Sequence, residues 1–148
     1  MSIKYFSFLL LALSMLSISC GDDDEEPAAQ LTIEQYIEEN NLTTQETTSG
    51  LHYIIKEQGV APNPMLSSDI TINYNGYFLN GNSFDSGNNV TFALSRLILG
   101  WQEGIQLIGT GGSITLLIPS ELAYGSSGRG GIPGNTPLGF EIDLIAFQ

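Results

Sequence analysis

Apolar side chains recur at every second position along much of the chain after Gly50. Such alternation is typical of strands that bury one face and expose the other. The alternating runs lie at residues 51–55, 70–74, 113–119 and 138–146. Two shorter runs, 77–79 and 83–85, flank Asn80-Gly81-Asn82, a sequence typical of a hairpin turn. The pattern predicts a largely antiparallel sheet of about five strands.

One stretch has a helical period instead. Residues 97–108 read LILGWQEGIQLI and contain the only tryptophan of the chain. Leu97, Trp101, Ile105 and Ile108 are separated by four, four and three positions, which is the apolar stripe of a short amphipathic helix. We therefore expect an α+β domain in which the antiparallel sheet wraps around one short helix. Trp101 would be either an apolar floor for a small bound group or only the largest core residue, and the spacing fits both.

The first 30 residues have the composition of a targeting signal followed by a tether. Lys4, the apolar run 5–16 and small residues precede the only cysteine, Cys20. Residues 1–19 are too short for a spanning helix and are predicted to be a signal peptide. They resemble a bacterial lipoprotein signal, which implies that Cys20 is lipidated and anchors the protein to a membrane of the bacterial cell envelope, the outer membrane in this prediction. A buried or free thiol is the alternative, because a lone cysteine cannot form an internal disulfide.

Residues 20–30 form an acidic tether, which cannot bury apolar area and is expected to stay solvated. An acidic run just after the cysteine accompanies surface display in some lipoproteins; a plain spacer is equally compatible with it. Residues 31–49 are predicted to be a short helical extension, since Thr32 and Gln35 form a capping-box pattern ahead of a helix over 31–41. A helix of that length is marginal alone, so it must dock or fray. The main domain is predicted to span residues 50–148.

Charge and composition exclude several functions. The formal net charge is −12, and no basic cluster offers the footprint that nucleic acid requires, so we expect no nucleic-acid partner. His52 is the only histidine, is expected to be solvated on the polar face of a strand, and leaves no basis for a zinc cluster or a Cys/His dyad. The Gly-x-Ser-x-Gly elbow is absent from the sequence. We therefore expect no metal and no cofactor.

An apolar aromatic concavity with a few polar groups suffices for one reaction, rotation about an X-Pro bond. The planar amide is held by a barrier of about 18–20 kcal/mol, and uncatalysed exchange takes tens to hundreds of seconds. A dry pocket stabilises the polar planar amide less than the twisted one. If this difference and directed hydrogen bonds supply roughly 5 kcal/mol, the rate rises about 10⁴-fold.

Five motifs, in order, carry a family resemblance: INYNG at 72–76, NSFDSG at 82–87, LILGWQEGI at 97–105, IPSELAYG at 118–125 and GFEIDLIAF at 139–147. Together they closely resemble the FKBP-type peptidyl-prolyl isomerases over about residues 50–148. The resemblance implies an FKBP-like fold and an enzyme that acts on proline-containing polypeptides and assists the folding of exported proteins. A monomer is expected.

The resemblance also implies residue roles. Trp101 would be the floor beneath the proline ring, and Asp85 the acid near the twisting amide. The N–H of Ile98 and the hydroxyl of Tyr124 would donate hydrogen bonds to substrate carbonyls. The remaining contacts to substrate are implied for five side chains: Tyr74, Phe84, Leu97 and Phe140 as walls, and Ile132, on the glycine-rich and proline-rich loop 123–137, as a cover.

Alternatives remain at several of these positions. The aromatic walls would also suit ordinary sheet core, Asp85 would also suit a cap on a turn at Ser86-Gly87, and Tyr124 would also suit a loop anchor. The segment after Asp85 departs from the family by lacking the basic residue that often pairs with the pocket acid. For the whole chain, the alternatives are a non-catalytic or chaperone-like lipoprotein that binds proline segments, and an envelope interaction protein that uses the tether and the 31–41 helix.

Overall fold

The computed structural model describes residues 30–148. The predicted signal peptide, Cys20 and all but the last residue of the tether lie outside the described residues. Among the described residues, no helix has the length and apolar character that a membrane span requires.

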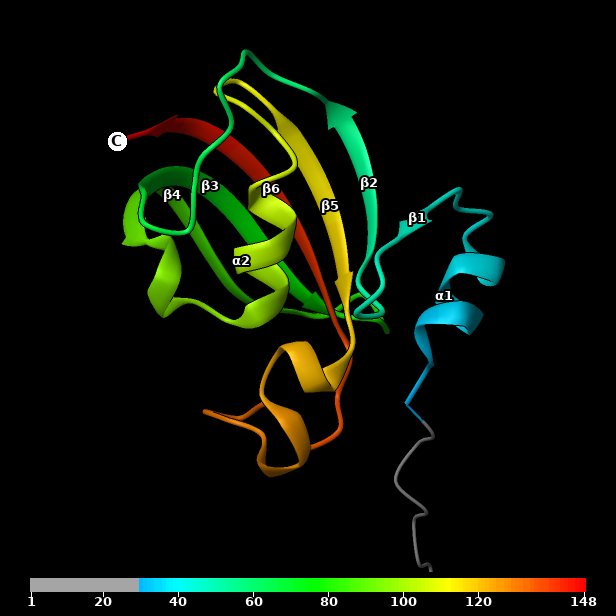
Figure 1. The fold of residues 1–148 in the computed structure, drawn as a ribbon. Coiled ribbons are helices and arrows are strands. Elements are labelled where there is room, and N and C mark those ends of the chain that lie inside the picture. The colour runs from blue at the N-terminus through cyan, green and yellow to red at the C-terminus, as the bar shows by residue number, and fades with distance from the viewer. Residues whose placement is uncertain (1–29) are drawn as a thin grey trace, which may run out of the picture.

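The described chain forms one six-stranded antiparallel sheet with two short α-helices (Figure 1). The strands are β1 (Gln45–Glu46), β2 (His52–Glu57), β3 (Asp69–Phe78), β4 (Ser83–Ala93), β5 (Ser113–Ile118) and β6 (Leu138–Phe147). The helices are α1 (Ile33–Glu39) and α2 (Leu99–Ile105), with short 3-10 turns at Leu94–Arg96, Ser120–Leu122 and Gly125–Ser127. The strand order is β1-β2-β5-β6-β3-β4, and every neighbouring pair is antiparallel. The predicted α+β class and sheet are confirmed, with six strands instead of about five.

At two points, Gly100 and Gly104, helix α2 has no side chain of its own on the side that packs against the side chains of β5. A Cβ added at Gly100 would lie 2.5 Å from Cγ2 of Ile118, and one added at Gly104 would lie 2.5 Å from Cδ2 of Leu116. Glycine therefore lets the helix approach the sheet closely and fixes the depth at which Trp101 sits.

The helix is shorter than the sequence pattern predicts. Leu97 and Ile98 precede it in extended conformation, with ψ of 174° and 150°, and Ile108 follows it. Ile108 is nevertheless fully buried, so the apolar stripe is real but continues past the helix into its flanks. The residues shortly before the helix belong to the sheet, because Val90 and Phe92 pair with Ile72 and Ile70 inside β4.

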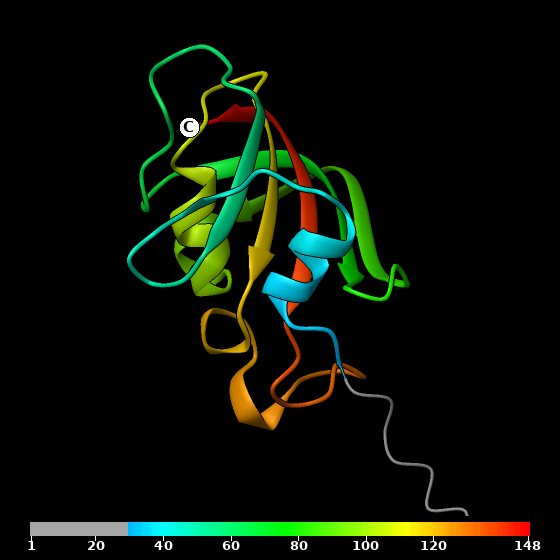
Figure 2. The same ribbon diagram turned by 90° about the vertical axis from the view of Figure 1, so that its right-hand side faces the viewer.

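The two helices lie on opposite faces of β5 (Figures 1 and 2). Leu116 lies beneath Gly104 of α2, whereas the next residue, Leu117, belongs to a buried cluster with Ile33 of α1 and Leu79. Successive strand residues point to opposite faces, so this alternation places α2 inside the curved sheet and α1 outside it. The capping box predicted for Thr32 and Gln35 is present at the start of α1.

His52 is not solvated as predicted. Its side chain is 14% exposed, because the extension folds over it. Thr44 Oγ1 lies 3.2 Å from Nδ1 of His52, and Glu46 Oε1 lies 3.8 Å from Nε2. Strand β1, which pairs with β2 at this point, could not be foreseen from local periodicity.

Candidate active site

A pocket opens between α2, the strands β3 and β4, and the loop that joins β5 to β6. Its volume is about 430 Å³, within the roughly 300–1,000 Å³ of small-ligand sites. Eleven residues from these elements and from β6 line it: Tyr74, Phe84, Asp85, Phe92, Arg96, Leu97, Ile98, Trp101, Tyr124, Arg129 and Phe140. Eight of the nine residues predicted for the catalytic and substrate-binding site are in this set.

Trp101 forms the floor of this pocket. Its side chain is buried at 5% exposure, yet it lines the cavity. The indole meets the rings of Tyr74 and Phe140 edge to face, each at a centroid distance of 5.1 Å, and that of Phe92 at 6.4 Å. Within the described residues its Nε1–H has no hydrogen-bond acceptor. The indole thus belongs to the core and also borders the open pocket, so it is more than the largest core residue, and its role as a floor for a bound group stays a prediction.

A glycine in β3 creates the space for the aromatic walls. Gly76 pairs with Asp85 on β4 and with Phe140 on β6. A Cβ at this position would lie 2.6 Å from the ring of Phe140 and 2.8 Å from that of Phe84. These two rings meet edge to face at 5.6 Å across the glycine. The wall residues therefore converge because the strand between them lacks a side chain.

Asp85 is held by Tyr74. The Tyr74 hydroxyl donates a hydrogen bond to Oδ2 of Asp85 over 2.8 Å, and the N–H of Ser86 donates to Oδ1 over 2.9 Å. Ser86 and Gly87 lie within β4, so the alternative in which Asp85 caps a turn at this point is wrong. Among the described residues, the carboxylate thus has a tyrosine hydroxyl, and no basic side chain, as its side-chain partner. Burial, and then the hydrogen bond to Asp85 and its charge, raise the pKa of Tyr74 to about 12, so this hydroxyl keeps its proton at neutral pH.

Two hydrogen-bond donors at the pocket lack acceptors within the described residues. The N–H of Ile98, the N-cap residue of α2, donates to no other described group. The hydroxyl of Tyr124 likewise has no partner in residues 30–148, so no hydrogen bond in this part of the chain supports its alternative role as a loop anchor. The Arg129 guanidinium lies 5.9 Å from the centre of the Tyr124 ring. Both donors are thus available to an acceptor on a ligand.

Ile132 is the one predicted site residue outside this pocket. It is 9% exposed and lines a neighbouring hollow of about 430 Å³. The residues around that hollow are Phe78, Phe84, Asp85, Tyr124, Arg129, Gly130, Gly131 and Ile132, four of which also line the Trp101 pocket. Ile132 therefore borders the site from the side, as part of the loop that joins β5 to β6.

Sequence reasoning missed three lining residues, Phe92, Arg96 and Arg129. Phe92 was hidden because β4 is irregular, with register shifts against β3 that break the alternation. The two arginines had a signal in the composition, since the chain has only four lysine and arginine residues. Two of those four cations border one pocket.

The model of the FKBP-type peptidyl-prolyl cis-trans isomerase family matches residues 61–145. The chain belongs to this family. An FKBP-type isomerase named FkpA from Buchnera aphidicola subsp. Baizongia pistaciae is 46% identical over 106 residues, covering 69% of this chain and 42% of that protein. The chain spans less than half the length of the curated relatives it matches.

Solved structures agree with this family assignment. The crystal structure of FkpA from Escherichia coli superposes with a TM-score of 0.73 at 36% identity, covering 78% of this chain and 57% of that one. A peptidyl-prolyl isomerase from Pseudomonas syringae pv. tomato superposes with a TM-score of 0.70 at 31% identity, covering 78% and 90%. The FKBP-like fold expected from the sequence is confirmed.

Proposed function

We propose that this chain catalyses cis-trans rotation about X-Pro bonds in polypeptides. The observation that carries the proposal is the convergence, in one open pocket, of the Trp101 floor, the Asp85 carboxylate and two free donors. None of these groups is a nucleophile activated for covalent chemistry, and rotation about an amide needs none.

In the proposed mechanism the proline ring rests on the indole between the rings of Tyr74, Phe84 and Phe140. The N–H of Ile98 and the hydroxyl of Tyr124 donate to carbonyl groups of the substrate and fix its backbone on both sides of the twisting bond. Asp85, oriented by Tyr74, lies beside that bond. The planar amide has more charge separation than the twisted one, so removing water from it lowers the barrier.

The proposed chemistry accounts for the composition of the site. Fixed donors act without reorganisation when the amide twists, which is why apolar walls and a few polar groups suffice. If the pocket lowers the barrier by roughly 5 kcal/mol, exchange accelerates about 10⁴-fold.

The test measures isomerisation of a four-residue peptide with one X-Pro bond, and magnetisation exchange monitors the rate. We expect exchange well above background for the wild type and a clear loss in Asp85→Val. Asp143→Val is the matched control, because Asp143 is an exposed acid on β6 that lies outside the pocket. No acceleration by the wild type would refute the proposal. Saturable quenching of Trp101 fluorescence without acceleration would indicate a module that binds proline segments instead.

Two further variants separate the contribution of the Trp101 floor from that of the Tyr124 hydroxyl. Trp101→Ala removes a buried aromatic side chain and is expected to lower the free energy of unfolding by about 3–5 kcal/mol and to abolish exchange. Tyr124→Phe removes one hydrogen bond worth about 1 kcal/mol and is expected to lower kcat/KM several-fold with little change in stability.

We also propose that the protein acts as a monomer on exported proteins, anchored to the bacterial outer membrane by a lipid on Cys20. The cysteine at the end of a signal-like run and the acidic tether after it support this placement. Labelling of expressing cells with an alkyne fatty acid tests it. We expect label on the wild type and none on Cys20→Ser, and an unlabelled wild type would contradict the anchor. Protease treatment of intact cells then distinguishes a surface-exposed protein from one that faces the periplasm.

A further inference from the structure

The Trp101 pocket is the first of three hollows in a row. It shares Phe84, Asp85, Tyr124 and Arg129 with the Ile132 hollow, which in turn shares Phe78 and Gly131 with a third pocket. We propose that these hollows form one groove for an extended client polypeptide, and that the third pocket binds an apolar side chain several residues away from the proline. This proposal rests on the proposed isomerase function and extends it to clients longer than a few residues.

A chain of aromatic contacts sets the length of the groove. The ring centroids of Trp101 and Phe140 lie 5.1 Å apart, those of Phe140 and Phe84 5.6 Å, and those of Phe84 and Phe78 5.1 Å. An extended polypeptide advances about 3.3 Å per residue, so these three steps correspond to at most about five residues. The apolar client side chain is therefore expected within about six positions of the proline.

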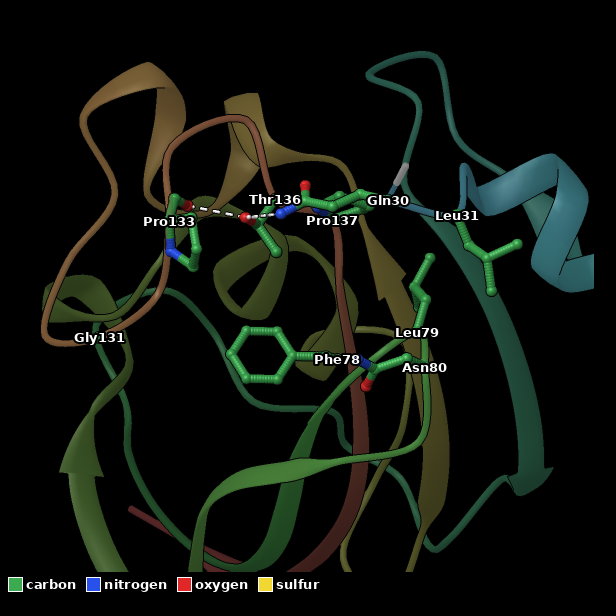
Figure 3. A pocket seen from close by; sticks show the side chains of 9 residues that line it. All are labelled: Gln30, Leu31, Phe78, Leu79, Asn80, Gly131, Pro133, Thr136 and Pro137. Atoms are coloured by element: carbon green, nitrogen blue, oxygen red, sulfur yellow. Dashed lines mark hydrogen bonds between the residues drawn. The ribbon is translucent and has the colours of Figure 1, made fainter. Parts of the chain in front are cut away.

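The third pocket, referred to below as the distal pocket, has the lining that an apolar side chain requires. Its volume is about 410 Å³, and it lies between the end of β3 and the loop that joins β5 to β6. Figure 3 shows the Phe78 ring beneath that loop, with Leu31 and Leu79 at the opposite end. The residues around it are Gln30, Leu31, Phe78, Leu79, Asn80, Gly131, Pro133, Thr136 and Pro137, of which none is charged.

Hydrogen bonds hold the rim of the distal pocket in place. The side-chain N–H of Gln30 donates to Oγ1 of Thr136 over 3.0 Å, and that hydroxyl donates to the carbonyl of Pro133 over 2.8 Å (Figure 3). These bonds join the segment before α1 to the loop, so the N-terminal extension supplies one part of the pocket wall. The rim is thus preformed, and binding would not have to order it.

The occupant we infer is a client segment, not the chain's own tether. The five residues 22–26 of the tether are all acidic, and burying carboxylates in an uncharged pocket without partners is costly. An unfolded client, by contrast, exposes leucine and phenylalanine side chains, which need no charged partner when buried. Continuity with the Trp101 pocket lets one such chain occupy both places at once.

The test compares peptides that differ only in one apolar residue. The short probe is the four-residue X-Pro peptide; the long probes add serine and glycine on both sides, with one leucine placed in turn at each position up to six from the proline. For the wild type, we expect at least one leucine position to raise kcat/KM about tenfold over the serine peptide of equal length, because burying a leucine side chain is worth at least that much. Equal values at all positions would overturn the groove.

Two leucines of the extension provide a matched pair of variants. Leu31 and Leu42 pack on the same buried cluster, but only Leu31 lines the distal pocket. In Leu31→Ser the ratio of kcat/KM between the best leucine peptide and its serine counterpart is expected to fall to about twofold or less. In Leu42→Ser the ratio is expected to stay near ten, and equal losses in both variants would contradict the assignment.

Asn80→Asp tests the distal pocket by a second route, in case Leu31→Ser fails to fold. Asn80 lies in the exposed turn, and Asp retains the oxygen that accepts the N–H of Asn82 while adding a charge beside the distal pocket. It is expected to lower the leucine preference in a chain that melts like the wild type. A lack of exchange with the short probe refutes the isomerase function, whereas exchange without a leucine effect refutes only the groove. A leucine effect that appears only after deletion of residues 21–29 would assign the distal pocket to the tether.

Discussion

The hydroxyl of Tyr74 donates a 2.8 Å hydrogen bond to Oδ2 of Asp85, and the same Tyr74 ring lies edge to face on Trp101 at 5.1 Å. One residue of β3 thus contacts both the pocket acid and the pocket floor. Asp85 itself is exposed on β4, and this contact, together with the hydrogen bond from the Ser86 N–H, holds its carboxylate at the pocket.

Removing the Tyr74 hydroxyl is expected to weaken catalysis through Asp85. A hydrogen bond to a charged group contributes about 1.5–3 kcal/mol, so Tyr74→Phe is expected to lower kcat/KM about tenfold while leaving the aromatic packing intact. When Tyr74→Phe is made in a chain that already carries Asp85→Asn, the further loss of kcat/KM should be much smaller, because the charged acceptor is already gone. Additive losses in this double-mutant cycle would show that Tyr74 acts independently of Asp85.

Stability is expected to fall at alkaline pH because of the same tyrosine. Burial, and then Asp85, raise the pKa of Tyr74 from 10.0 to about 12 in the folded chain. Below pH 10 the hydroxyl is protonated in both states, and its contribution to stability is complete. Between pH 10 and 12 only the unfolded chain loses this proton, so the free energy of unfolding decreases as the pH rises through that window.

Urea unfolding at a series of pH values measures this effect. Tyr74→Phe should show a shallower decline than the wild type between pH 10 and 12. Some decline should persist, because burial also raises the pKa of Tyr77. Identical slopes in the variant and the wild type would contradict the assignment to Tyr74.

Local patterns predicted the parts of this fold that depend on local order. The runs at 113–119 and 138–146 became β5 and β6, and Trp101 was placed on the one helix of the main domain. The ends of that helix were missed because Leu97 and Ile108, which lie just outside the helix, continue its apolar stripe. His52 was misjudged because the strand that covers it comes from the extension.

In the pocket, too, some residues could be predicted from the sequence and others depend on tertiary structure. The family resemblance placed eight of nine site residues correctly around the cavity, whereas Phe92 and the two arginines entered the lining only through tertiary structure. The register shifts between β3 and β4 turn these strands in a way that no fixed period describes. Nor could the sequence show that the Tyr74 hydroxyl contacts Asp85, since the two residues lie on different strands.

Glycine at 104 is expected to be required despite its low helix propensity. Alanine would gain about 1 kcal/mol in propensity. Its Cβ, however, would lie 2.5 Å from Cδ2 of Leu116, which is fully buried, and overpacking a core costs about 1–3 kcal/mol. We expect Gly104→Ala to lower both the free energy of unfolding and kcat/KM, because the helix that moves carries Trp101. Leu99→Ala, at a 54% exposed position of the same helix, should change stability by less than about 0.5 kcal/mol, and a stabilised Gly104→Ala would contradict the close approach.

The two arginines at the pocket are expected to favour acidic residues near the proline of a substrate. Arg96 and Arg129 form no ion pair with any residue between 30 and 148, whereas Lys56 is bonded to Glu141. An exposed charge pair contributes about 0.2–1 kcal/mol, so a glutamate beside the proline should raise kcat/KM up to about fivefold over a lysine at the same place.

Ionic strength and charge removal test this preference. Because exposed pairs are screened within about 10 Å at 0.1 M salt, the preference should shrink as salt is added. An Arg96→Gln, Arg129→Gln double variant should lose the preference while still isomerising a neutral peptide, since the proposed mechanism uses neither guanidinium. Lys56→Gln is the matched control, because it removes a cation that does not line the pocket and should leave the ratio between the two peptides unchanged. Equal rates for the glutamate and lysine peptides at low salt would show that the positive charge of the pocket rim does not select substrates.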